Sequence, residues 1–515
     1  MSTQRIFEEG DPAGPTVVLV QGQPDTSRVW DAVVPLLADR FHLVRYDSER
    51  GSRYADDFAA VLDTVTDGAP VHVLAHGWGS AGVWQYLTRP GAGERIASLT
   101  SVAGPSPEHV SGYLRSALTQ PLHPRRFAGG LGQLARLAVT APRTVTDKTA
   151  RTNLRGAGTS RPVDVPVQLI VATADPYVSA GVYDDMAASA TRVWRRDVKA
   201  GRDLPTSHPA VLARALTQLV DHLDGAPAAR ELRRAEVGRS RKTFGDTLVA
   251  ITGAGSGIGR ATALAFARDG ADVVLADVDA AGLEETARLV SATGSQAYHY
   301  TVDVADAATV EAFAEQVCAE HGVPDIVVNN AGVGHAGFFL DTPAEEFDRV
   351  IDINFGGVVN GCRSFGRRLA DRGTGGHIVN VASMASYTPV NVMNAYCTSK
   401  AAVFMFSDCL RAELDSHGIN LTTICPGVIG TNIVETTRFS LPESRSADLE
   451  TIRRRARRGF AVRRVGPEAV ADAIVAAVKS NKPVRPVTAE AYLVYGISHA
   501  FPQAMRSGAR GGNIM

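Results

Sequence analysis

Cysteine is scarce in this sequence of 515 residues, which contains only five. All of them fall in the C-terminal half, and no two have the Cys-x-x-Cys spacing that is typical of a metal or redox site. We therefore expect no metal site, and we expect the thiols to be reduced and mostly buried. The five residues are Cys318, Cys362, Cys397, Cys409 and Cys425.

An excess of charge of either sign is also lacking, because 53 Lys and Arg residues stand against 54 Asp and Glu residues, a formal net charge of -1. This balance predicts no nucleic-acid partner. No apolar run approaches the roughly 18 residues of a transmembrane helix, so no integral membrane segment is expected. The first residues, MSTQRIFEEGDPAG, lack a basic and then apolar signal segment, which favours a cytoplasmic protein.

The length exceeds what one hydrophobic core usually supports, which indicates more than one domain. Apolar strand candidates alternate with longer helical patterns along the whole chain, a pattern typical of parallel sheets covered by helices. We expect an α/β domain over residues 1–225 and a second α/β domain over residues 244–515. Residues 226–243 between them are rich in Arg and have no clear apolar face, so we expect a basic, solvated linker or an exposed helix.

A glycine-rich string, LVAITGAGSGIG, runs from an apolar strand into a helix in the second half. Gly253 permits a tight turn, Gly257 lets the backbone approach a pyrophosphate, and Gly259 allows the helix to pack closely on the sheet. Free N–H groups at the start of the helix would then face the phosphates. This context predicts a dinucleotide site.

Asp277 ends the next strand, about 20 residues after the glycines, where a carboxylate can accept hydrogen bonds from the ribose hydroxyls. The same carboxylate would repel a 2'-phosphate at short range, so we expect NAD in preference to NADP. Arg260 follows the glycines and leaves NADP open as the alternative cofactor.

A tyrosine and a lysine lie four residues apart in the helical pattern AYCTSKAAVFMFSDCLRAEL, so Tyr396 and Lys400 share one helix face. An ammonium beside a phenol favours the phenolate, so we expect Lys400 to lower the pKa of Tyr396 toward the range of a working acid or base. Ser383 can then hydrogen-bond the substrate oxygen while hydride moves to or from the nicotinamide.

Residues 245 to about 510 resemble a short-chain dehydrogenase/reductase, on the motifs TGAGSGIG, DV, NNAG, YCTSK and PG taken in that order. The resemblance implies a Rossmann-type doubly wound parallel sheet, an NAD(P)-dependent oxidoreductase and a homodimer or tetramer. It also implies that Asn354 holds a water that links Lys400 to solvent, that Asp303 meets the adenine and that Thr431 meets the nicotinamide amide.

The complete set of residues that these motifs assign to chemistry falls in two groups. The catalytic residues are Asn354, Ser383, Tyr396 and Lys400. The cofactor-binding residues are Gly253, Ser256, Gly257, Ile258, Gly259, Asp277, Asp303, Val304, Asn330, Ala331, Gly332, Tyr396, Lys400, Pro426, Gly427 and Thr431.

Apolar side chains between the serine and the tyrosine, and after Asn330, predict an apolar site for a small lipophilic substrate. They are Met384, Tyr387, Val390, Val392, Met393, Val333 and Phe338. We therefore predict that the second domain interconverts a secondary alcohol and a ketone on a lipophilic substrate. The alternative from another class is a nucleotide-sensing scaffold in which neither half turns over.

The first half resembles the α/β-hydrolase fold, most closely its epoxide hydrolase branch. The stretch LAHGWGS resembles the nucleophile elbow of that branch, whose central residue is an aspartate, but Gly77 stands there. QGQP resembles the His-Gly-x-Pro motif with Gln21 in the histidine's place, and KAGRD resembles the general-base stretch with Arg202 in the histidine's place. Only Asp175, in ATADPYV, matches the orienting acid.

Glycine has no attacking atom and Arg does not accept a proton near neutral pH, so we predict a degenerate, catalytically inactive hydrolase domain. The order of the domains resembles bacterial fusion proteins that join an epoxide hydrolase to a short-chain dehydrogenase. We hypothesise that the domain binds a lipophilic chain, contacts a partner or stabilises the dehydrogenase. Two alternatives stay open: an inert remnant, or a bifunctional enzyme in which Ser80 or Asp175 works with His208.

Overall fold

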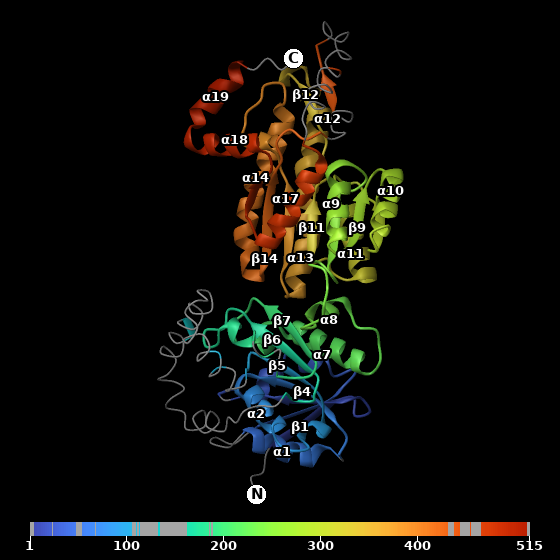
Figure 1. Ribbon diagram of the computed structural model, residues 1–515, viewed down its shortest axis with the longest axis vertical. Coiled ribbons are helices and arrows are strands. Elements are labelled where there is room, and N and C mark those ends of the chain that lie inside the picture. The colour runs from blue at the N-terminus through green and yellow to red at the C-terminus, as the bar shows by residue number, and fades with distance from the viewer. Residues whose placement is uncertain are drawn as a thin grey trace. The chain divides into compact units, whose positions relative to one another are not determined.

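The computed structural model describes residues 5–22, 24–47, 54–66, 68–105, 162–184, 189–430, 437–442 and 465–511, together with residues 110, 113, 132–133, 186 and 454. The chain divides into two compact units, Met1–Ser240 and Arg241–Met515. Each unit is built on one seven-stranded sheet with helices against it (Figure 1). The prediction of two α/β domains is therefore confirmed.

The sheet of the first unit has the strand order β1-β3-β2-β4-β5-β6-β7, in which β1 is antiparallel to β3 and the other pairs are parallel. Its central strands are continuous apolar runs because both faces are covered. The strands are β1 (Arg5–Gly10), β2 (Thr16–Val20), β3 (His42–Asp47), β4 (Val71–His76), β5 (Ile96–Val102), β6 (Val167–Ala172) and β7 (Val193–Val198).

Helices cover both faces of this sheet and bury two apolar cores. Helices α1 (Tyr54–Val65) and α2 (Gly77–Leu87) pack in one core, and α7 (Pro209–Leu223) packs in the other. The short helix α6 (Leu204–Ser207) precedes α7. Since α2 begins at the residue after β4 ends, the strand-to-helix elbow predicted from the sequence is present.

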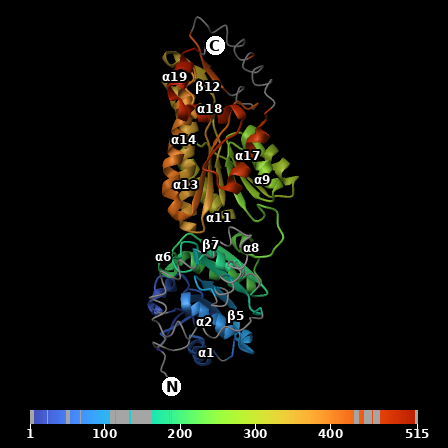
Figure 2. The ribbon, with the colours of Figure 1, turned by 60° about the vertical axis from the view of Figure 1, so that its left-hand side comes forward.

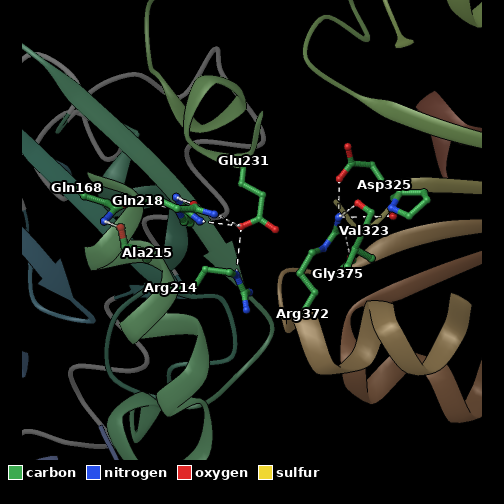
Figure 3. Close-up of polar contacts among 11 residues, drawn as sticks. Gln168, Arg214, Ala215, Gln218, Glu231, Val323, Asp325, Arg372 and Gly375 are labelled. Carbon is green, nitrogen blue, oxygen red and sulfur yellow. Dashed lines mark hydrogen bonds and ion pairs between the residues drawn. The ribbon is translucent and has the colours of Figure 1, made fainter. Parts of the chain in front are cut away.

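The segment expected to be a solvated linker or an exposed helix contains a helix, α8 (Arg230–Ala235), which belongs to the first unit and is partly buried. Leu232 of α8 is fully buried against Trp194 and Leu219. The apolar contribution of α8 is only Leu232 and Ala235 among charged residues, so composition concealed the packed face. Figure 3 shows Glu231 of α8 facing side chains of α7.

A buried ion pair fixes α8 to the sheet. The Arg196 guanidinium on β7 lies 3.1 Å from a Glu231 carboxylate oxygen and donates to Gln168 and Gln218. Burial lowers the pKa of Arg196 to about 10, while the charge of Glu231 acts in the opposite direction. Arg214 adds a second cation 3.3 Å from Glu231 (Figure 3). The segment therefore contributes a carboxylate, Glu231, to packing within the first unit.

The sheet of the second unit has the order β10-β9-β8-β11-β13-β14-β16, and all its pairs are parallel. The order reverses between β8 and β11, and in such a sheet the crevice beyond the carboxyl ends of those strands is the expected ligand site. The strands are β8 (Leu248–Thr252), β9 (Asp272–Asp277), β10 (Ala297–Thr301), β11 (Ile326–Asn329), β13 (Gly376–Val381), β14 (Ile419–Cys425) and β16 (Val484–Pro486). A separate small sheet pairs β12 (His335–Gly337) with β15 (Arg438–Ser440).

Helices sandwich the second sheet, as Figure 2 shows. Alternate strand residues enter two cores, one shared with α9, α10 and α17 and the other with α11, α13 and α14. The helices are α9 (Gly257–Arg268), α10 (Ala280–Ser291), α11 (Ala307–His321), α12 (Ala344–Ile351), α13 (Gly357–Arg372), α14 (Asn394–Leu414), α17 (Pro467–Ser480), α18 (Ala489–Ala500) and α19 (Pro502–Gly511).

The end of α13 is tied to the start of β11 by a buried arginine. Arg372 Nη1 lies 2.7 Å from Asp325 Oδ1, and Nη2 donates to the Gly375 carbonyl at 2.7 Å (Figure 3). The other carboxylate oxygen of Asp325 accepts from the Leu248 amide at 3.0 Å. This network aligns the amino ends of β8 and β11. The two strands therefore also end level with each other at the carboxyl edge of the sheet. Within the described ranges, no helix has the length and hydropathy needed to cross a bilayer.

Candidate active site

The glycine string forms a turn that only glycine fits. Gly253 has a φ of +66° and Gly257 a φ of +52°, both in the left-handed region. A Cβ atom at Gly259 would overlap the Gly253 carbonyl oxygen. Ser256 is the N-cap of α9, makes no side-chain cap hydrogen bond and is followed by Gly257 and Ile258. The first N–H groups of α9 are therefore left for an anion such as a pyrophosphate.

Asp277 lies where the sequence places it, at the carboxyl end of β9. Its Oδ2 accepts from the Gly255 amide at 2.8 Å and its Oδ1 from the Asp279 amide at 3.1 Å. Arg260 donates to the carbonyl oxygens of Gly255 and Gly282. The guanidinium is thus held by the loop itself, and the carboxylate stands at the edge of the glycine turn.

The loop after β11 closes on the glycine turn. Asn330 Nδ2 donates to the Thr252 and Gly253 carbonyl oxygens at 2.9 and 3.1 Å. The Ala331 amide donates to Thr252 Oγ1 at 3.2 Å. Thr252, which the motif reading did not single out as a site residue, therefore joins the two loops. Its signal in the sequence is its place as the first residue of TGAGSGIG.

The remaining cofactor residues line other strand ends. Asp303 is exposed and its Oδ1 accepts from the Ala305 amide at 3.0 Å, while Val304 is buried. The Pro426 carbonyl accepts from the Met384 amide at 2.8 Å, and a Cβ at Gly427 would overlap Thr488 Oγ1. Thr431 lies outside the described residues.

Lys400 is buried on α14, with 4% of its surface exposed. Its Nζ donates to the Val381 carbonyl oxygen at 3.0 Å. Burial lowers the pKa of Lys400 to about 8. A lysine with this pKa exchanges its proton near neutral pH, as a proton relay requires.

Tyr396 lies on the same face of α14 as Lys400, and its phenol is close enough to Ser383 for that side chain to affect its pKa. Burial raises the pKa of Tyr396, and the Ser383 hydroxyl opposes the rise. We expected Lys400 to lower this pKa; in the structure burial is the larger influence, because the ammonium is directed at the Val381 carbonyl. Ser383 also accepts from the Ala385 amide at 3.1 Å, which fixes its orientation.

Asn354 completes the group from a π-helical turn, Asp352–Gly356. The side chain is fully buried; its Oδ1 accepts from the Val333 amide at 2.7 Å, and its Nδ2 donates to Ser399 Oγ at 3.1 Å. A Cβ at Gly332 would lie 3.1 Å from Asn354 Oδ1 and 3.4 Å from Lys400 Nζ. The amide oxygen and the ammonium therefore flank the same glycine, and a π-turn often marks such a site.

The backbone conformation of Val392 is a feature that the sequence did not reveal. Its φ is +63°, a conformation that costs a β-branched residue free energy. The Gly337 amide donates to the Val392 carbonyl at 2.7 Å, which holds the strained residue between Ser383 and Tyr396. No local pattern signals it, because valine is disfavoured in this conformation.

Of the apolar residues predicted to contact the substrate, some are packed against other elements and others are exposed to solvent. Tyr387 donates to the Ala491 carbonyl at 3.2 Å and packs edge-on against Tyr495 at 5.3 Å, so α18 covers it. Phe338 is 39% exposed and is followed by the more exposed Phe339. The loop after β12 therefore presents apolar side chains to solvent beside the elements that carry the catalytic group.

The elbow of the first unit holds an arginine where a nucleophile would stand. Gly77 has a φ of +57°, and a Cβ added there would lie 2.6 Å from Arg202 Nη2. His76 Nε2 lies 2.7 Å from the Arg202 carbonyl oxygen. Asp175 Oδ1 accepts from the backbone amides of Tyr177 and Val178. The sequence positions assigned to nucleophile and base thus meet in space, carrying glycine and arginine.

The alternative catalytic residues have other neighbours. Ser80 is fully buried, 2.7 Å from Ser101 Oγ and 3.0 Å from the Gly104 carbonyl. His208 stands between α6 and α7 with Nδ1 2.9 Å from Ser207 Oγ. Gln21 Nε2 donates to the Tyr46 carbonyl. Among the residues that the structure describes, no group of His, Cys, Asp and Glu is arranged to hold a metal ion.

Comparison with known proteins identifies the class. Residues 247–440 match the short chain dehydrogenase family, and residues 15–129 match the alpha/beta hydrolase fold family. An oxidoreductase of Mycobacterium tuberculosis, named probable oxidoreductase EphD, is 52% identical over 568 aligned positions, covering 98% of this chain and 96% of that protein. The chain therefore belongs to the same family: a short-chain dehydrogenase/reductase carried behind an α/β-hydrolase-fold unit.

Two further similarities fall in the second unit. The D-threitol dehydrogenase of Mycolicibacterium smegmatis is 38% identical over 183 residues, covering 36% of this chain and 70% of that enzyme. A solved structure of a short-chain dehydrogenase/reductase from Burkholderia phymatum, in complex with NAD, is 29% identical with a TM-score of 0.47, covering 51% of this chain and 95% of that one.

The buried charge of Lys400 predicts a pH-dependent stability. A pKa of about 8 in place of 10.5 disfavours the folded state only while the unfolded lysine is protonated, so the parent chain gains stability as the pH rises from 8 to 10.5. The stability advantage of Lys400→Met over the parent should therefore shrink by about 3 kcal/mol between pH 7 and pH 10.5, measured by denaturant unfolding. Lys482→Met, at an exposed lysine, is the control. Equal behaviour of the two variants would contradict the prediction.

Proposed function

We propose that the second unit interconverts a secondary alcohol and a ketone on a small lipophilic substrate. The observation that carries the proposal is the cluster of Tyr396 beside Ser383, with Lys400 and Asn354 on either side of Gly332. A phenol, a buried amine and a polar route to solvent are what removal of a hydroxyl proton requires. The contrasting proposal, a nucleotide sensor, gives no reason for a buried lysine one helical turn from a half-buried tyrosine.

The residues of the cluster divide the work by their chemistry. Tyr396 exchanges a proton with the substrate oxygen, and Ser383 donates a hydrogen bond that positions the same oxygen. Lys400 takes up the proton from the phenol side, and Asn354 would hold the water that carries this proton from Lys400 to solvent. NAD(H), when bound, supplies or accepts the hydride. The glycine turn would hold its pyrophosphate at the first N–H groups of α9, and Asp277 at the end of β9 would hold its ribose.

Replacing Tyr396 with Phe should abolish turnover, since the ring stays and the acid or base is lost. We expect a fall of at least a hundredfold in kcat, with NADH binding unchanged by fluorescence titration. Turnover is measured on a panel of lipophilic secondary alcohols and ketones with the full chain. The matched control is Tyr300→Phe, a tyrosine that contacts Glu320 on the far side of α11. Full activity of Tyr396→Phe would remove the assignment, and an inactive parent chain would favour the sensor.

We also propose that the unit prefers NAD(H) to NADP(H). Asp277 supports this, because its carboxylate is fixed by two backbone amides and cannot turn away without losing both. Arg260 is engaged by loop carbonyls and would have to leave them to reach a 2'-phosphate. The second unit is further proposed to form a dimer or tetramer through its helices, which agrees with the 63% exposure of Met405 on α14.

Asp277→Ala should narrow the preference for NADH over NADPH by at least tenfold, since removal of the carboxylate ends the repulsion of a 2'-phosphate. Fluorescence titration of both cofactors measures it, and Asp272→Ala, at the other end of β9, serves as the control. Tighter binding of NADPH by the parent chain would contradict the proposal and would assign the 2'-phosphate to Arg260.

The first unit is proposed to be a hydrolase fold without hydrolase activity. Gly77 supplies no nucleophile, and Arg202 fills the space beside it with a group that does not accept protons. The loss of a nucleophile alone costs many orders of magnitude in rate.

The full chain should therefore hydrolyse neither epoxides nor esters above background. A double variant that supplies both groups, Gly77→Asp with Arg202→His, should gain measurable epoxide opening, because Asp175 remains to orient the new histidine. Each single variant should stay inactive, which makes them the matched controls. Epoxide opening by the parent chain that is lost in His208→Ala would show a working hydrolase of another design.

A further inference from the structure

Two positively charged groups lie together at the N-terminus of α2: the free N–H groups of the helix and the Arg202 guanidinium. Its N-cap residue, His76, makes no side-chain cap hydrogen bond, so the first N–H groups of the helix keep their partial positive charge. The Arg202 guanidinium stands 2.6 Å from the position of a Gly77 Cβ. Across the described part of the chain, no carboxylate forms an ion pair with Arg202, which lies 5.5 Å from the centre of the Tyr177 ring. Two like potentials in contact are stabilised when an anion lies between them.

Tyr183 carries a buried hydroxyl without a partner in the described ranges, and the charge of Arg202 acts on it. Tyr183 is 2% exposed, and its hydroxyl has no hydrogen-bond partner among the residues described. Burial raises the pKa of Tyr183, and the charges of Asp175 and Arg202 act on it in opposite directions, so the ring reaches into their field. A buried hydroxyl normally finds a partner, and an oxygen bound beside Arg202 would provide one.

Gly22 lies against two backbone amides of the elbow, where a larger residue has no room. At Gly22, a Cβ would lie 2.7 Å from the Trp78 nitrogen and 2.6 Å from the Gly79 nitrogen. Any other residue at 22 would press its side chain against these two amides. The elbow therefore combines three kinds of donor, a guanidinium, helix-end amides and a phenolic hydroxyl, with one nearby carboxylate, Asp25, whose Oδ2 lies 3.6 Å from His76 Nδ1.

We propose that the elbow of the first unit binds the carboxylate of a small lipophilic acid, as a binding site and without chemistry. The planar guanidinium matches a carboxylate with two parallel hydrogen bonds. A single negative charge suits the site better than a phosphate dianion, because Asp175 already contributes a negative charge to the field around Tyr183. The acid's chain would meet apolar surroundings, since Tyr183 belongs to an apolar core with Tyr113, Val182 and Met186.

The absence of a side chain at Gly77 is what lets the Arg202 guanidinium stand at the elbow without an internal carboxylate. An aspartate at position 77 would place its own carboxylate against Arg202 and fill the site from within, at a left-handed φ that Asp and Asn tolerate better than other side chains. The carboxylate of the proposed ligand would thus occupy the place that an aspartate side chain at position 77 would fill. This inference is independent of the dehydrogenase reaction.

Calorimetric titration of the full chain with sodium hexanoate tests the proposal. We expect saturable binding that weakens at least tenfold in Arg202→Gln and in Gly77→Asp, while Gly77→Asn retains more affinity than Gly77→Asp. Arg89→Gln removes a surface arginine of the same unit, paired with Asp56, and should bind as the parent does. Hexanamide, which lacks the charge, should bind at least tenfold more weakly than hexanoate.

A second measurement does not depend on the choice of acid. In thermal unfolding, Gly77→Asp should melt above Gly77→Asn, and the difference should vanish in the Arg202→Gln background, because the internal carboxylate needs its cation. Absence of hexanoate binding, equal binding by Arg202→Gln, equal binding of hexanamide, or preferential binding of inorganic phosphate would each overturn the proposal. So would a melting difference that survives the loss of Arg202.

Discussion

The dehydrogenase site depends on one constraint: the backbone turn after β8 must lie in close contact with the backbone turn after β11. A Cβ at Gly259 would overlap the Gly253 carbonyl, and a Cβ at Gly253 would lie 2.8 Å from the Ala331 Cα. Asn330 then ties the two turns by donating to two carbonyl oxygens of the glycine turn. Because the turns are this close, the start of α9, Asp277 and the loop before Asn354 converge on one crevice.

The catalytic group includes a buried amine, Lys400, and burial disfavours its charged form. Lys400 is held by one backbone carbonyl and flanked, across Gly332, by the Asn354 amide oxygen. Without the glycine, a methyl group would intrude between the amine and the amide. The fold therefore accepts a buried amine with a lowered pKa in order to keep a titrating group next to a tyrosine. Stability and chemistry are set against each other at this one position.

Local patterns explain how far the sequence alone could lead. The two sheets follow from apolar strands alternating with helices, and the glycine turn, Asp277 and the Tyr396–Lys400 spacing are read within single elements. Features that depend on contacts between residues far apart in the sequence could not be predicted in this way. The π-turn around Asn354 leaves no periodic signal, and the left-handed Val392 runs against its own preference. Likewise α8 looked solvated because its packing depends on Arg196, over thirty residues earlier in the chain.

The elbow of the first unit shows that a turn can keep its shape when its chemistry is absent. Glycines at 22, 79 and 104 are each required by close packing: a Cβ at Gly79 would lie 2.5 Å from the Gln21 carbonyl oxygen, and one at Gly104 2.6 Å from the Ser80 Cβ. These contacts hold β4, α2 and the neighbouring loops together whatever stands at position 77. Resemblance to a hydrolase therefore follows from packing, and function must be argued from the groups that the turn presents. Here those groups are donors without a nucleophile, a set that can bind an anion and cannot attack a carbon.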